Sequence, residues 1–243
     1  MTGGIMQQHR SVGPYELQAA EHRHVDGARS VMLDTFYRDF GYGYRSDWHH
    51  DVIDLAGTYL DPDHHALFVA TKGDEVVGTT AVRAAAPKSP PHPRFLVERY
   101  PEETTAQLFR VYVRPEHRRC GLARALVGLA IEFVTRQPRY QALYLHTDTR
   151  IDGAEAFWRS MASPIFDPRD GRDDTYQAVH FEIALPGRLQ PHRDEDVEAA
   201  SPRSAADHGP DQSPTEFDRV AGRSTPPAPP TPGRPPARLP GPR

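Results

Sequence analysis

The sequence LFRVYVRPEHRRCGLARALV, from Leu108 to Val127, decides the fold of this 243-residue chain. Its first part belongs to a predicted strand, 107–113, which runs into a basic turn containing Pro115. Its last part opens a predicted helix, 121–136, whose apolar residues recur on one face at helical spacing. Pro138 stops this helix. The segment therefore predicts a strand, a tight basic turn and an amphipathic helix in direct succession.

The turn has the composition of an anion-binding site. A helix N-terminus presents backbone N–H groups without intrahelical partners and the positive end of the helix dipole, which suits a phosphate group. Gly121 and Ala123 have little side-chain bulk, so an anion can approach the backbone closely. We expect Arg118, Arg119 and Arg124 to add positive charge around it. A merely solvated basic turn is the alternative, and the glycine at the helix start favours the phosphate site.

These residues resemble the central motif of the GNAT superfamily of N-acetyltransferases, Arg/Gln-x-x-Gly-x-Gly/Ala, which reads here Arg118-x-x-Gly121-x-Ala123. The resemblance implies that the turn binds the pyrophosphate of acetyl-CoA and that the preceding strand pairs its backbone with the pantetheine arm. No metal is expected. The cofactor-binding residues expected on this basis are Val111, Tyr112, Val113, Arg118, Arg119, Cys120, Gly121, Leu122, Ala123, Arg124, Phe157 and Trp158.

A second segment, DGAEAFWRSM at 152–161, is similar to the later helix of the same family, typically Ala-x-x-aromatic-Tyr. Two departures concern catalysis. Trp158 stands where the family has a Tyr that often protonates the leaving thiolate, and an indole N–H is no practical acid. The family often has a Glu on the central strand as general base, whereas Gln107 and Phe109 stand near that position here.

The catalytic residues therefore stay open at the level of sequence. A base acting through water could be Glu102, Glu103 or His146, and nothing chooses among them. Tyr112 and Tyr144 are the candidates for the acid. A structural role is the alternative for His146. Catalysis by Cys120 is disfavoured, because direct attack of an amine on a thioester needs no enzyme thiol.

The remaining segments predict an α/β (α+β) layered domain, and the resemblance, which covers 15–185, implies a GNAT-like mixed, mostly antiparallel central sheet with helices on both faces. A Pro-rich connection, 84–105, is either a functional loop or a spacer containing one helical turn. The other expected elements are a strand 15–19, a helix 25–40, a helix 47–59 capped by Ser46, a hairpin of 66–71 and 75–83, a strand 142–146, a helix 154–161 capped by Asp152, and a last strand 177–185.

Composition divides the chain into one folded domain and two flanking segments. The stretch 188–243 holds 13 of the 25 prolines and very few aliphatic or aromatic residues, so it cannot bury enough apolar surface to offset its chain entropy. We therefore expect a disordered N-terminus at 1–13, an N-acetyltransferase domain at 14–186 and a Pro-rich disordered tail at 187–243. No signal peptide or long apolar run is evident, which favours a cytoplasmic protein without membrane association.

Charge and cysteine content exclude several classes of protein. The net charge is −4, and no basic block long enough for nonspecific nucleic-acid binding is present. The single cysteine, Cys120, excludes an internal disulfide scaffold. The pairs His49-His50 and His64-His65 suggest metal ligands, but adjacent histidines point apart and no further ligands complete a set, so surface roles are favoured.

The function predicted first is transfer of an acetyl group from acetyl-CoA to a primary amine of a small molecule or protein. A catalytically weak or inactive acyl-CoA-binding sensor module is the alternative, motivated by the missing Glu and the replaced Tyr. An interaction protein acting through its Pro-rich tail is a third hypothesis. The identity of the amine is beyond the sequence, and homodimer formation is left open.

Overall fold

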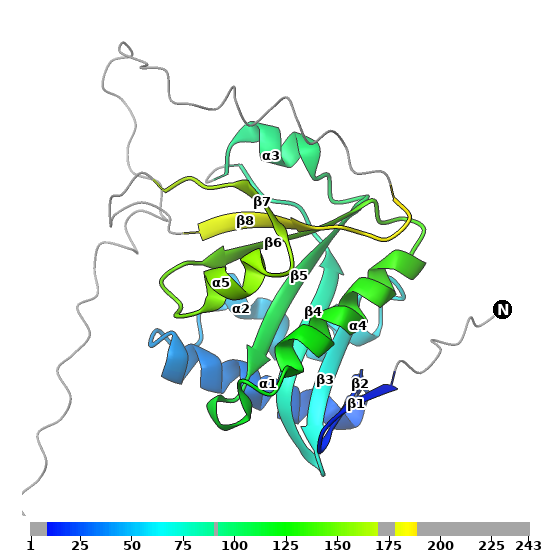
Figure 1. Cartoon of the computed structure of the whole chain (residues 1–243), viewed down its shortest axis with the longest axis vertical. Helices are drawn as coiled ribbons and strands as arrows, with labels where there is room; N and C mark the ends of the chain where they lie inside the picture. The colour runs from blue at the N-terminus through cyan, green and yellow to red at the C-terminus, as the bar shows by residue number, and fades with distance from the viewer. Residues whose placement is uncertain (1–8, 90–91, 170–177, 189–243) are drawn as a thin grey trace, which may run out of the picture.

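The computed structural model describes residues 9–89, 92–169 and 178–188. Within these ranges the strands form one eight-stranded sheet in the order β1-β2-β3-β4-β5-β6-β8-β7 (Figure 1). Every neighbouring pair is antiparallel except β5 and β6, which run parallel. The mixed, mostly antiparallel sheet expected from the sequence is therefore confirmed.

The elements alternate between strands and helices along the chain. The strands are β1 (His9–Val12), β2 (Tyr15–Ala19), β3 (Ala66–Lys72), β4 (Glu75–Ala84), β5 (Thr105–Val113), β6 (Ala142–Asp148), β7 (Ser163–Phe166) and β8 (Ala178–Ile183). The α-helices are α1 (Val25–Asp34), α2 (Ser46–Ile53), α3 (Arg94–Arg99), α4 (Leu122–Arg136) and α5 (Ala154–Arg159). Short helical turns of other types are η1 (His22–His24), η2 (Thr35–Asp39), η3 (Ala56–Leu60) and η4 (Pro115–His117).

The sheet separates two apolar cores, because successive side chains of a strand point to opposite faces. On β3, Phe68 belongs to the core that contains the buried face of α4, whereas Leu67 and Val69 belong to the core that contains α1. Helix α4 lies in front of the sheet in Figure 1 and α1 lies behind it. The predicted helices on both faces are confirmed.

The predicted central hairpin forms because its turn residue suits a tight reversal. Strands β3 and β4 pair from Ala66–Val82 to Lys72–Glu75, and Gly73 between them has a φ of +59°. Glycine adopts a left-handed backbone without steric cost, so a two-residue connection is available here. The strand 15–19 and the helix 121–136 also match the structure within one residue at each end.

Several sequence-based boundaries were wrong. Residues 9–12, expected to be disordered, form β1 and pair with β2, and the four-residue β7 was not predicted. Arg45 rather than Ser46 is the N-cap of α2, and the predicted helix 47–59 breaks at Asp54 into α2 and η3. Gly153, with φ +74°, replaces Asp152 as the N-cap of α5. Short edge strands and cap geometry leave little periodic signal in a sequence.

The structure tests the prediction for the Pro-rich connection but not the prediction for the tail. The described part of the connection 84–105 contains the short helix α3, as one of its two interpretations expects. The predicted tail, 187–243, lies outside the described residues except for 187–188. Its disorder therefore stays a prediction from composition.

Candidate functional site

Strands β5 and β6 pair only over their first residues and then separate. Their parallel ladder ends at the pair Gln107–Tyr144. Beyond it, β5 stays paired with β4 through Val113, while β6 stays paired with β8, and the two strands diverge in Figure 1. The β6-facing backbone of β5 from Leu108 onward therefore has no strand ladder. Unpaired groups at such an edge are suited to an extended, hydrogen-bonding ligand.

The basic turn links this open edge of β5 to α4 through two left-handed residues. After η4, Arg119 has a φ of +62° and Gly121 has a φ of +80°. The glycine at 121 has no steric cost in this conformation, whereas a β-branched residue is disfavoured there. Gly121 is the N-cap of α4. The left-handed turn thus orients the start of the helix immediately after the strand.

The first turn of α4 carries backbone donors that have no partner within the helix. The N–H of Ala125 donates to the Gly121 carbonyl oxygen at 3.0 Å, which is the first bond of the helical series. The N–H groups of Leu122, Ala123 and Arg124 therefore have no intrahelical acceptor. A Cβ added at Gly121 would meet no heavy atom of the protein within 4 Å. The space beside Gly121 is therefore open, and phosphate binding by these donors stays a prediction.

The arginines around the turn have different roles. The guanidinium of Arg118 donates to the Val113 carbonyl oxygen at 2.8 Å and forms an ion pair with Asp39 of η2. Arg118 therefore holds the turn against β5 and η2. Its charge, which was expected to face the anion, is balanced by the Asp39 carboxylate. No hydrogen bond or ion pair joins the exposed Arg119 to the described part of the chain. Arg119 is accordingly the arginine most available to an anion.

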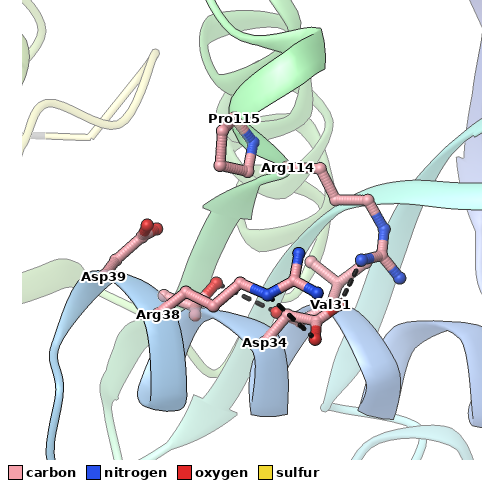
Figure 2. A pocket seen from close by; sticks show the side chains of 7 residues that line it. Val31, Asp34, Arg38, Asp39, Arg114 and Pro115 are labelled. Atoms are coloured by element: carbon pink, nitrogen blue, oxygen red, sulfur yellow. Dashed lines mark hydrogen bonds and ion pairs between the residues drawn. The ribbon is translucent and has the colours of Figure 1, made fainter. Parts of the chain in front are cut away.

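A small charged pocket lies behind the turn, between η2, α1 and the end of β5. Figure 2 shows Arg38 and Arg114 reaching the carboxylate of Asp34 from two sides, with Asp39 and Pro115 beside them. The cavity measures about 10 Å³, which is about the space that one water needs. It therefore serves as an anchor between α1 and the turn and cannot hold a nucleotide.

Helix α5 and the start of α4 meet on the β6 side of the opening. Arg124 of α4 donates to the Ser160 hydroxyl at 2.7 Å, and that hydroxyl donates to the Phe157 carbonyl oxygen. Phe157 is half-buried and stays a candidate wall residue. Trp158 is only 7% exposed and packs in the core that contains α4, so its indole is a core side chain. Cys120 is exposed.

The carboxylate candidates lie away from the turn. Glu102 and Glu103 are exposed and precede the start of β5, at the opposite end of this strand from Gly121. The backbone carbonyl of Glu103 accepts hydrogen bonds from Arg139, and this contact belongs to the surface. The structure brings neither carboxylate together with the phosphate-binding donors.

The two tyrosine candidates lie on different strands. Tyr112 is half-buried on β5, and its ring lies 6.0 Å from Phe36 and 5.8 Å from Phe40, centroid to centroid. Burial raises the pKa of Tyr112 above its ordinary value, although the charge of Arg110 opposes that shift. Tyr144 is fully buried on β6, and its hydroxyl is 2.6 Å from Nδ1 of His180. Tyr112 is therefore a protonated phenol at neutral pH.

His146 belongs to a cluster of three imidazoles that the sequence did not reveal. His146, His180 and His92 have ring centroids 4.8–5.9 Å apart. Burial, with repulsion from neighbouring histidines, lowers the pKa of His146 to about 4 and that of His180 to about 3. All of these rings are neutral at pH 7. In the described ranges no group of histidine, cysteine or carboxylate side chains is arranged to hold a metal ion.

The role of Arg110, which shapes the middle of β5, was not predicted from the sequence. Arg110 has a φ of +53°, and the β4–β5 register shifts here so that β5 carries one extra residue. Its guanidinium pairs with Asp51 of α2. An arginine within an apolar strand was the available signal, but its partner lies 59 positions away and cannot be found from spacing.

Strand β5 separates from its parallel neighbour β6 and leads directly into the open start of helix α4. The resemblance implies this arrangement for an acyl-CoA-dependent acyltransferase. A family model described as "Acetyltransferase (GNAT) family" matches residues 29–162. That match covers more than half of the chain, which therefore belongs to the GNAT acetyltransferase family.

The curated relatives that the chain resembles are named as N-acetyltransferases. Rat N-acetyltransferase 8B is 34% identical over 113 residues, covering 46% of this chain and 46% of the relative. Human N-acetyltransferase 8 is 33% identical over 111 residues, covering 46% of this chain and 44% of the relative. The matched part thus spans about half the length of the relatives.

Solved structures show the same fold at low sequence identity. An acetyltransferase from Streptococcus agalactiae superposes with a TM-score of 0.53 at 16% identity, over 71% of this chain and 99% of that protein. A GNAT acetyltransferase from Staphylococcus aureus gives 0.52 at 13% identity, over 70% of this chain and 99% of that protein. In the part of the chain that the structure describes, no helix is both long and apolar enough to cross a membrane.

Proposed function

We propose that the chain transfers an acetyl group from acetyl-CoA to a primary amine of a small molecule or protein. The observation that carries the proposal is the open helix start at Gly121, which directly follows the unpaired edge of β5. Backbone N–H groups of 122–124, with Arg119, would bind the pyrophosphate. The edge of β5 at 111–113 would pair with the pantetheine arm.

In this reaction the amine nitrogen forms a bond to the thioester carbon, and the carbonyl electrons move onto its oxygen. Backbone N–H groups of β5 would stabilise that oxyanion. Collapse breaks the carbon–sulfur bond and releases the CoA thiolate. The attacking nitrogen loses one proton, and the thiolate gains one, so the products are an amide and free CoA thiol. A primary amine with a pKa near that of lysine, about 10, must first lose a proton to attack.

A second candidate function is acyl-CoA binding without transfer. Trp158 favours it, because this side chain replaces the family's Tyr acid and is 7% exposed within the core. Neither Glu102 nor Glu103 supplies a carboxylate near the turn. Under this candidate the same donors bind the cofactor, but no amine is acetylated.

One experiment separates the two candidates. Purified protein is mixed with acetyl-CoA and a panel of primary amines and peptides, and thiol release and product mass are followed together. The expected result is thiol release that depends on one class of amine and matches amide formation one to one. The same amines acetylated beforehand serve as controls and should release nothing. Saturable acetyl-CoA binding without thiol release from any amine would support the binding module instead.

A further inference from the structure

Arg110 occupies a backbone conformation that arginine rarely adopts. Its φ of +53° lies in the left-handed region, where glycine is the ordinary choice. The residue forms a β-bulge: Ala81 of β4 faces Phe109, whereas Thr79 faces Tyr112. The Thr79 hydroxyl donates to the Arg110 carbonyl oxygen at 2.7 Å and fixes the bulge from the β4 side.

A buried ion pair fixes the bulge from the other side. The Arg110 guanidinium donates to the Asp51 carboxylate through Nη2 at 2.5 Å and Nε at 3.0 Å, and to the Trp48 carbonyl oxygen at 2.9 Å. The Tyr59 hydroxyl donates to Asp51 Oδ2 at 2.6 Å. The Asp51 side chain is 0% exposed and that of Arg110 is 10% exposed. Each carboxylate oxygen of Asp51 therefore accepts at least one hydrogen bond.

This arrangement is not explained by stability alone. A left-handed non-glycine residue costs of order 1 kcal/mol or more, and a buried ion pair is often no more stabilising than apolar side chains of similar volume. Burial on its own would raise the pKa of the Asp51 carboxyl, yet the hydrogen bonds and charge of Arg110 hold it below its ordinary value. Asp51 is therefore ionised at neutral pH, and the charged pair is a permanent clamp between α2 and β5.

The clamp lies where the proposed reaction takes place along β5. The β5–β6 ladder ends at Gln107, and the bulge at Arg110 falls between that point and the basic turn after Val113. An extra residue in a strand re-aims the backbone groups that follow it. The backbone of Tyr112 pairs with Thr79 of β4, so the N–H group of Val111, the residue after the bulge, takes its direction from the conformation of Arg110.

We propose that Asp51 and Arg110 are positioning residues, which hold the β5 bulge so that the backbone after it is directed at the thioester carbonyl. The proposal rests on the proposed acyl transfer. Neither side chain needs to touch the substrate, because the pair acts through the backbone. Oxyanion donors must be placed accurately before the reaction, and losing one costs about 10²–10³-fold in rate in enzymes of this kind of chemistry.

The test compares Asp51→Asn, Arg110→Gly and the double variant with wild type. Asp51→Asn keeps the shape of the side chain and removes its charge. Arg110→Gly removes the clamp but accepts a positive φ without strain. Leu55→Ala is the matched control, because Leu55 is fully buried in the core behind the bulge and its apolar side chain cannot pair with Arg110 or Asp51. Initial rates of thiol release give kcat and KM, and calorimetry gives the acetyl-CoA affinity.

We expect kcat to fall at least about tenfold in each single variant, with acetyl-CoA affinity within about threefold of wild type and no further loss in the double variant. Leu55→Ala should lose stability but keep its kcat per folded molecule. Wild-type kcat in folded Asp51→Asn and Arg110→Gly, or an equal loss in Leu55→Ala, would overturn the positioning role.

A second readout keeps this inference separate from the proposed function. Amide hydrogen exchange of 109–113 is measured with acetyl-CoA in wild type and Asp51→Asn. Faster exchange confined to these amides shows that the pair holds the bulge, and unchanged or uniformly faster exchange shows that it does not. If wild type releases no thiol with any amine, both the acyl transfer and the catalytic role of the pair are rejected. The exchange result then decides by itself whether the Asp51–Arg110 pair holds the bulge.

Discussion

Arg110 and Gly121 are both left-handed residues on the path from β5 to α4, with φ values of +53° and +80°. At Arg110 a long side chain ends in a buried ion pair that closes the site from behind. At Gly121 a missing side chain leaves the helix donors open, with no heavy atom within 4 Å of an added Cβ. Side-chain contacts thus hold the Arg110 end of the proposed cofactor site in place. The Gly121 end stays accessible because it has no side chain.

The largest expected effect on stability is at the closed end. Asp51→Ala leaves the charge of Arg110 buried without its partner, and breaking such a pair costs about 3–5 kcal/mol. Asp26→Ala removes the partner of Arg29 in an exposed pair, and this loss should cost less than about 1 kcal/mol. Urea denaturation of both variants measures the difference. Equal losses would show that the Asp51–Arg110 pair is no more than a surface contact.

The second prediction separates two neighbouring arginines at the open end. Arg119→Ala should weaken acetyl-CoA binding by about 1–3 kcal/mol and leave the free energy of unfolding nearly unchanged, because its side chain is exposed. Arg118→Ala should do the reverse and cost about 1 kcal/mol of stability, since it removes contacts with Asp39 and Val113. Calorimetry and denaturation on the same samples compare them. A larger loss of acetyl-CoA affinity in Arg118→Ala than in Arg119→Ala would show that Arg118 binds the anion.

The third prediction concerns the pH dependence of stability, to which several histidines contribute. His146 and His180 have folded pKa values of about 4 and about 3, below the ordinary 6.5, so the unfolded chain binds protons first as pH falls. The free energy of unfolding should therefore decrease from about pH 6.5 to about pH 3. Tyr144 contacts His180, the rings of His92 and His146 face it, and the charge of Asp167 partly opposes the shift.

Substitution within the cluster tests the source of that acid sensitivity. His180→Asn removes one of the protonating groups, so its stability should fall less steeply between pH 6.5 and pH 4 than that of wild type. His50→Asn is the control, because His50 is exposed on α2. Identical slopes for wild type and His180→Asn would show that this buried ring does not contribute.

The smallest expected effect is at the carboxylates before β5. Glu102→Gln and Glu103→Gln should each lower kcat by about tenfold or less, whereas a positioned general base contributes about 10²–10⁴-fold. Both side chains are exposed and lie beyond the start of the strand, away from the turn. Thiol-release kinetics with the reactive amine measure the change. A loss greater than a hundredfold at either residue, with acetyl-CoA affinity unchanged, would identify a dedicated base there.

The sequence predicted those parts of the fold that depend on local periodicity. The β3–β4 hairpin and α4 follow from alternating and helical apolar spacing, and both match the structure closely. The turn at Gly121 was predicted because helix starts and glycine have known backbone chemistry. The short strands β1 and β7 were missed because their edge positions bury few apolar residues.

The closed half of the site could not be predicted, because it depends on contacts between distant residues. Asp51 and Arg110 are 59 positions apart, and nothing in the identity of an arginine signals a positive φ. The histidine cluster joins residues from β6, β8 and the segment before α3. The ion pair of Arg118 could not be predicted either, because its partner Asp39 lies 79 positions earlier in the chain.

The central claim is that acetyl-CoA binds at the open helix start, and calorimetry on Gly121→Val tests it most directly. The valine side chain would occupy the space that the anion needs, and it would also strain a backbone with φ +80°. Gly73→Val is the matched control, because Gly73 has a φ of +59°, equally open surroundings and a place in the β3–β4 turn. We predict no detectable acetyl-CoA binding by folded Gly121→Val and wild-type affinity for Gly73→Val. Wild-type affinity in folded Gly121→Val would contradict the site and, with it, the proposed acyl transfer at this turn.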